Sequence, residues 1–204
     1  MACAALCVAV LSACSSNCPI PHESAFVRHH LPMGFSFSYP NEWALEELHN
    51  AVWMRNYCEP AIWLNAAYYE IHDLDLISTE TEFFRYVQEG LSKTDGEGRF
   101  FPSENSSQLV NVESTICVRS VGKLEERSTQ NPGEVIHHID RGDLQCLHPT
   151  KEGWLIHLFY WVEDNRQPAV SPEQKIGEQF LESLQIRDRD NNGFNTDAGK
   201  TGAG

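Results

Sequence analysis

The sequence lacks an apolar run that is long enough to stay in a membrane as a helix. Its most apolar stretch, MACAALCVAVLSAC at positions 1–14, contains no charged residue. A helix that spans a bilayer needs about 20 apolar residues, whereas the apolar part of a signal peptide needs roughly 7–15. The stretch therefore predicts a signal peptide over residues 1–13. The Lys or Arg that usually starts such a signal is missing as well, and the alternative is a buried apolar strand or helix.

Basic residues are also scarce. The chain has 15 Lys and Arg against 29 Asp and Glu, which gives a net charge of −14. This balance argues against binding to nucleic acid and against electrostatic adhesion to anionic lipid. It is compatible with a basic protein partner, although solubility alone also accounts for it.

Motifs for catalysis and metal binding are missing too. There is no CxxC pair for a redox site or zinc finger and no GxSxG turn for a serine nucleophile. His137 and His138 are neighbours in a strand-like run, so they point to opposite faces, and each would need His148 or His157 from another strand to bind a metal. We predict no catalytic residue, no metal site and no cofactor. A pair of acidic side chains for glycoside hydrolysis, brought together by the fold, would escape this search.

The residues LSAC at 11–14 resemble the lipobox of bacterial lipoproteins, in which a small residue precedes an obligatory cysteine. The resemblance implies that Cys14 is diacylated and becomes the first residue of the mature chain. Two or three acyl chains anchor a protein far better than one. Ser15 follows the cysteine, where aspartate would indicate the inner membrane, so the resemblance favours the outer membrane, facing the periplasm.

Seven cysteines are present, of which Cys3 and Cys7 would leave with the signal peptide. Four more remain besides Cys14, and in an oxidising periplasm four cysteines allow three pairings. Cys117 and Cys146 both lie in strand-like runs, so they can face each other across a sheet. We name these two as the candidate disulfide and leave Cys18 and Cys58 unassigned.

The rest of the chain divides into a tether, one domain and a tail. Residues 14–32 contain Pro and Ser and predict a lipidated tether, residues 33–187 predict the folded domain, and the polar residues 188–204 predict a disordered tail. The stretch 94–107 predicts a loop, 108–126 a single strand-like run, and the RGD at 141–143 a hairpin turn.

Alternating patterns predict strands, and two stretches predict helices. Thr79 and Glu82 have the capping-box spacing at the start of a helix over 79–93, and Ser171 caps a second helix over 171–186. Residues 43–56 read as a strand, with a helix as the alternative. The fold class predicted is α+β, a mainly antiparallel sheet covered by two or more helices.

The opening GFSFSYPNEW and the closing FLESLQI are similar to the corresponding ends of the PsbP-like and DcrB-like family, over residues 33–187. The resemblance implies an α/β/α sandwich. Members of that family are mostly non-enzymatic assembly factors, adaptors and envelope lipoproteins, so the resemblance carries over no catalytic residue.

The aromatic content of the predicted strands is the remaining clue. Exposed Trp and Tyr commonly anchor protein interfaces, and we name Trp63, Tyr69, Trp154 and Trp161 as candidate partner-binding residues. Neighbours such as Tyr68 and Tyr69 face opposite sides of a strand. Burial on both faces beneath helices is the alternative.

These observations lead to one expectation with alternatives. We expect a membrane-anchored, periplasm-facing lipoprotein that binds a protein and performs no chemistry. One version is an immunity protein that neutralises a basic, periplasm-targeted toxin, using a loop such as 94–107. The other is an adaptor for envelope assembly, and an envelope hydrolase is the third alternative.

Overall fold

The computed structural model describes residues 26–56, 61–71, 77, 79–93, 98–131, 133–163 and 171–187. The predicted signal peptide, Cys14 and the predicted tail lie outside these residues. The elements in chain order are β1 (Phe26–His30), β2 (Phe35–Pro40), β3 (Ala44–Glu47), β4 (Ala51–Asn56), β5 (Ile62–Glu70), α1 (Glu80–Ser92), β6 (Phe100–Val112), β7 (Thr115–Arg127), β8 (Val135–Leu147), β9 (Trp154–Glu163), α2 (Pro172–Glu182) and β10 (Gln185–Ile186). Neither of the helices described here is long and apolar enough to cross a membrane.

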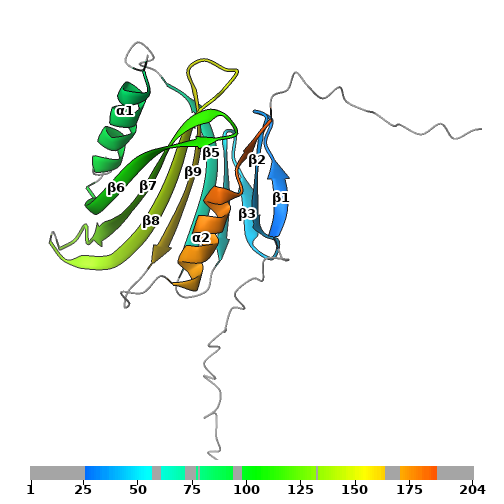
Figure 1. Cartoon of the computed structure of the whole chain (residues 1–204). Helices are drawn as coiled ribbons and strands as arrows, with labels where there is room; N and C mark the ends of the chain where they lie inside the picture. Colours follow the sequence, from blue (N-terminus) through cyan, green and yellow to red (C-terminus); the bar gives the residue numbers. More distant parts are fainter. Residues whose placement is uncertain are drawn as a thin grey trace, which may run out of the picture.

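The strands form two sheets, in which neighbouring strands run antiparallel. Seven strands pair in the order β3-β4-β5-β9-β8-β7-β6, and a small sheet pairs in the order β1-β2-β10. Figure 1 shows α2 and the small sheet beside the large sheet, with α1 near β6 and β7. The predicted α+β class is therefore confirmed.

The two faces of the large sheet carry different side chains, because successive residues of a strand alternate between faces. The face that carries Leu64, Leu144, Leu158 and Tyr160 packs against α2 and the small sheet to form the main core. We call it the α2 face. The opposite face carries Leu155 and Val118, which pack beneath α1 in a smaller cluster. We call it the α1 face.

Both helices begin where local chemistry predicts. The Thr79 hydroxyl accepts a hydrogen bond from the Glu82 backbone N–H at 3.2 Å, and the Ser171 hydroxyl accepts one from the Gln174 N–H at 3.1 Å. Such caps satisfy backbone donors that the first turn leaves unpaired. Phe83 and Val87 then lie on the buried stripe of α1.

Two segments that the sequence predicts as tether and loop form strands at the edges of the sheets. Strand β1 lies inside the predicted tether 14–32, where it pairs with β2 and the Arg28 guanidinium donates to the Ser36 hydroxyl at 3.1 Å. Residues 100–107 of the predicted loop 94–107 belong to β6. Both are edge strands with much exposed surface, so they lack the apolar alternation that predicts a strand.

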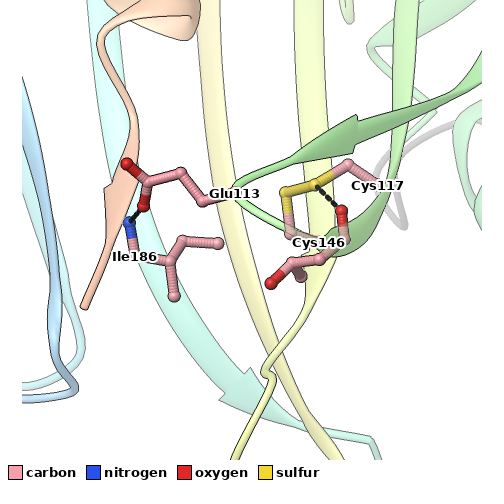
Figure 2. The surroundings of a disulfide bond; sticks show 5 residues. Glu113, Cys117, Cys146 and Ile186 are labelled. Atoms are coloured by element: carbon pink, nitrogen blue, oxygen red, sulfur yellow. Dashed lines mark hydrogen bonds between the residues drawn. A yellow bond between two sulfur atoms is a disulfide. The ribbon is translucent and has the colours of Figure 1, made fainter. Parts of the chain in front are cut away.

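The predicted single run 108–126 is a hairpin. Glu113 and Ser114 form its two-residue turn with φ angles of 47° and 69°, the left-handed values that a tight hairpin requires. Figure 2 shows that the Glu113 carboxylate accepts a hydrogen bond from the Ile186 N–H, at 2.6 Å, which ties this turn to β10. The turn contains no Gly, Asn or Asp, the residues that adopt positive φ most readily, so the sequence lacks the usual sign of a two-residue hairpin.

The predicted turn at 141–143 is instead the middle of β8. A side chain at Gly142 would collide with the ring of Tyr160, coming within 2.7 Å of Cζ and 2.9 Å of the hydroxyl oxygen. Gly177 of α2 abuts the same buried ring from the helix side. Gly142 is therefore needed for the close packing of Tyr160 and not for a change of chain direction.

Cys117 and Cys146 are directly opposite in the β7–β8 pair and form a disulfide on the α2 face (Figure 2). Both are fully buried in the main core. The two cysteines lie 29 residues apart in sequence, and their bond links β7 to β8.

Candidate functional site

Helix α1 covers only one end of its face, and the uncovered part is rich in aromatic side chains. Trp53 of β4 packs edge-to-face on Phe159 with ring centres 5.5 Å apart, and Phe159 lies 5.6 Å from Trp161. The same row reaches Phe100 of β6, 5.2 Å from Trp161. Within the described residues neither helix packs over this row. We call the row the trough; it is defined by Trp53, Trp63, Phe100, His157, Phe159 and Trp161.

Two hollows open along the trough. The larger, about 390 Å³, lies where the C-terminal turn of α1 meets the sheet, and we call it the α1 hollow. The smaller, about 190 Å³, lies near Trp53, Trp63 and Glu163, and we call it the Glu163 hollow. Trp161 lines both, so they belong to one continuous surface.

Two buried polar side chains, Arg141 and Asp143, and the half-buried His157 form one wall of the α1 hollow. The ring Nε2 of His157 lies 3.0 Å from Asp143 Oδ1, and Arg141 Nε lies 3.6 Å from Asp143 Oδ2. Arg141 also donates to the Leu91 carbonyl at 2.9 Å, which ties the sheet to the last turn of α1. Asp143 Oδ2 and Arg141 Nε are buried and have no hydrogen-bond partner among the described residues.

Burial changes the pKa of two groups that line the α1 hollow, Arg141 and Tyr69. It lowers the pKa of Arg141, while the neighbouring Asp143 carboxylate opposes that shift. It also raises the pKa of Tyr69, and the nearby Tyr86 and Asp143 add to the increase. Tyr69 therefore stays neutral and donates a hydrogen bond to Gln145 at 3.3 Å.

The α1 hollow combines aromatic side chains with a few oriented polar groups. The Asp143–His157 pair positions an imidazole, but the described lining of the α1 hollow offers no Ser, Thr or Cys as a nucleophile beside it. Aromatic walls with a few oriented polar groups are typical of a recognition surface.

The structure separates the four predicted partner-binding residues. Trp63, Tyr69 and Trp161 lie on the α1 face, as the β5–β9 register requires. Trp154 lies on the α2 face, where its ring packs 5.9 Å from that of Tyr68 at the edge of the main core.

The pairings of His137 or His138 with His148 or His157, which the sequence left open, are not formed among the described residues. The His148 ring bonds to the Met33 carbonyl at 2.8 Å and accepts from two backbone N–H groups, and His157 is held by Asp143. His137 instead lies with Glu126 and Glu163, and one ligand atom from each of these three residues lies within 4.8 Å of the others. Among the residues that the structure describes, these three form a group that could hold a metal ion.

The alternation of β9 by itself puts His157 on the face of Phe159 and Trp161, whereas nothing local in the sequence puts Arg141 and Asp143 there. Both were assigned to a turn. The signal that places them beside the trough, in the wall of the α1 hollow, is the register of β8 against β9, which sets Arg141 opposite Trp161 and Asp143 opposite Phe159.

Comparison with known proteins yields similarity in structure alone. No family model and no curated protein matches the sequence. The PsbP protein of Synechocystis sp. PCC 6803 superposes with a TM-score of 0.51 at 14% identity, covering 80% of this chain and 93% of PsbP. The Ran-binding protein Mog1p of Saccharomyces cerevisiae superposes with a TM-score of 0.52 at 10% identity, covering 79% of this chain and 95% of Mog1p. The domain thus has a PsbP-like fold.

Proposed function

We propose that this PsbP-like domain is a non-catalytic protein-binding module, and that the trough is its docking surface. One observation carries the proposal. A row of half-buried Trp and Phe side chains, next to the Arg141–Asp143–His157 cluster, lies on the part of a sheet face that the described helices leave uncovered. Contiguous apolar surface of this kind, with polar groups at its edge, is typical of interaction sites.

Charge and location refine the proposal. A net charge of −14 favours a basic partner, because complementary charge speeds and orients encounter. The lipobox-like LSAC supports anchoring through Cys14, on the periplasmic side of the outer membrane. The Ran-binding name of yeast Mog1p shows that one protein of this fold binds a protein, although a likeness of fold identifies no partner.

Two versions of this function differ in the partner. An immunity protein would occlude the active site of a basic toxin that reaches the periplasm. An envelope adaptor would hold a resident complex of the cell envelope. In both versions the contact would include β6, whose Phe100–Ser107 part replaces the predicted loop and forms the edge of the large sheet.

Site-specific photocrosslinking in the producing cells tests the docking surface. A photoreactive amino acid would replace Trp63 or Trp161 in the full-length, membrane-bound protein. The matched control would replace Val121, which is exposed on the α2 face. We expect one protein to crosslink from both trough positions and not from the control. Crosslinking that is equal from all three positions, or absent from the trough, would refute the docking surface.

The identity of the crosslinked protein separates the versions. A secreted hydrolase that is inactive in the purified complex would establish immunity, and a resident envelope complex would establish the adaptor. Turnover of a lipid or glycan panel by the purified protein, lost on Asp143→Asn or His157→Gln, would instead establish a hydrolase. Metabolic labelling with palmitate tests the anchor separately, since Cys14→Ser should abolish the label.

A further inference from the structure

We propose that Glu126, His137 and Glu163 form a binding site for a divalent transition-metal ion of the Zn²⁺ class. One imidazole and two carboxylates are a ligand set that Zn²⁺ and its neighbours accept. Ca²⁺ and Mg²⁺ prefer oxygen ligands alone. Glu126 and Glu163 line the Glu163 hollow at one end of the trough, but metal binding does not depend on the docking function proposed above.

Strand register brings the three ligands together. Glu126 of β7 is directly opposite His137 of β8. Glu163 of β9 is opposite Ile139, which is two residues from His137 and on the same face. The ligands therefore come from three adjacent strands, which hold a site more rigidly than loops do.

The spacing of the ligand atoms suits one ion. One atom from each side chain lies within 4.8 Å of the other two. An ion bound at about 2.1 Å from each would separate them by roughly 3–4 Å. Small rotations of the side chains close that difference without moving the strands.

The state of the histidine is the second observation. The Nδ1 atom of His137 is buried and has no hydrogen-bond partner among the described residues. A buried polar atom without a partner costs free energy, about 1–3 kcal/mol. Coordination of a metal ion by the His137 ring would give this side chain a partner. The adjacent His138 faces the other side of the sheet.

Arg99 supports the site from outside. Its Nε donates to Glu126 Oε1 at 2.7 Å, and Glu126 is only 5% exposed. This bond orients the carboxylate and leaves its second oxygen for an ion, as outer hydrogen bonds do in metal sites. Arg99 also balances one of the two carboxylate charges.

The Glu163 hollow provides room for a further ligand. Glu126 and Glu163 line it together with Trp53, Trp63 and Trp161. Three protein ligands and one open position are typical of sites where water or a partner group completes the coordination.

The test is calorimetric titration of the purified full-length protein, without a histidine tag, with ZnCl₂. We expect one equivalent to bind, and Co²⁺ to give the absorption of a site with nitrogen and oxygen ligands. His137→Gln and Glu163→Gln should each weaken binding at least about 10-fold. The matched control is His138→Gln, on the neighbouring residue that faces away, and it should bind as the wild type does.

Several outcomes would overturn the proposal. They are no stoichiometric binding by the wild type, equal binding by His137→Gln, or an equal loss in His138→Gln. The metal-free thermal transition of each variant is measured alongside, so that loss of binding is separated from loss of folding. Because Glu163 is replaced by an amide of the same shape, that variant remains decisive if His137→Gln folds poorly.

Discussion

The packing of Tyr160 makes a sharp prediction for Gly177→Ala. Gly177 lies inside α2, and a methyl group there would come within 2.6 Å of Tyr160 Cδ2 and closer still to Cγ. Tyr160 is fully buried, Gly142 blocks the opposite side of its ring, and its hydroxyl is bonded to Glu178 at 2.6 Å. The ring therefore has nowhere to move.

The expected magnitude follows from two opposing effects. Overpacking a core costs about 1–3 kcal/mol. Replacing Gly by Ala inside a helix gains about 0.5–1 kcal/mol. We expect Gly177→Ala to lower the free energy of unfolding by about 1–2 kcal/mol. For a chain of this size that lowers Tm by roughly 2–8 °C.

Thermal and urea denaturation, followed by circular dichroism, measure the change. Gly90→Ala in α1 is the matched control, because a methyl group at Gly90 meets nothing within 4 Å. It should raise stability by up to about 1 kcal/mol. In a Tyr160→Leu background the added methyl at Gly177 should cost less. A Gly177→Ala protein as stable as the wild type would refute the reasoning.

Three further predictions concern other contacts. Removing the disulfide by Cys117→Ala with Cys146→Ala should lower stability by roughly 3–4 kcal/mol, from the chain entropy of the loop it closes; an unchanged urea midpoint would contradict the bond. Ser114→Gly should raise stability by about 1 kcal/mol, because glycine adopts the φ of 69° without strain; a lowered Tm would contradict this. Tyr160→Phe tests a pH effect. Burial, together with the hydrogen bond to Glu178, raises the pKa of the Tyr160 hydroxyl above its value in the unfolded chain. The neutral hydroxyl therefore stabilises the fold below about pH 10, and this contribution is lost as the pH rises above 10. The wild type should thus lose stability more steeply than Tyr160→Phe above pH 10, and parallel pH profiles would contradict this.

Helices and fold class could be predicted from the sequence because their signals are local. The capping residues Thr79 and Ser171 lie within a few positions of the apolar stripes that they introduce. The alternation of Phe35 and Phe37 with serine in β2 is a local pattern of the same kind. Each of these patterns reports a single element.

The site could be predicted only in part, because it depends on register between distant strands. The period of β9 placed His157, Phe159 and Trp161 on one face. Asp143 joined them only through the pairing of β8 with β9. Gly142 read as a turn residue because the ring that requires it, Tyr160, is supplied from the next strand.

The metal-ligand group illustrates the same limit. No second ligand lies at a metal-binding motif spacing from His137 in the sequence, because Glu126 and Glu163 come from the two flanking strands β7 and β9.

The small sheet has a practical consequence for anyone who attaches a handle to this protein. Strands β1 and β10 flank β2, so both ends of the described fold leave on the side of the α2 face, behind the trough. Phe26 is opposite Pro40 and Ile186 is opposite Phe35, so the two ends exit about 17 Å apart along β2. A fluorophore, bead or biosensor surface joined at either end would leave the trough facing outward. Immobilised protein should therefore present its aromatic surface to solution without a redesigned linker.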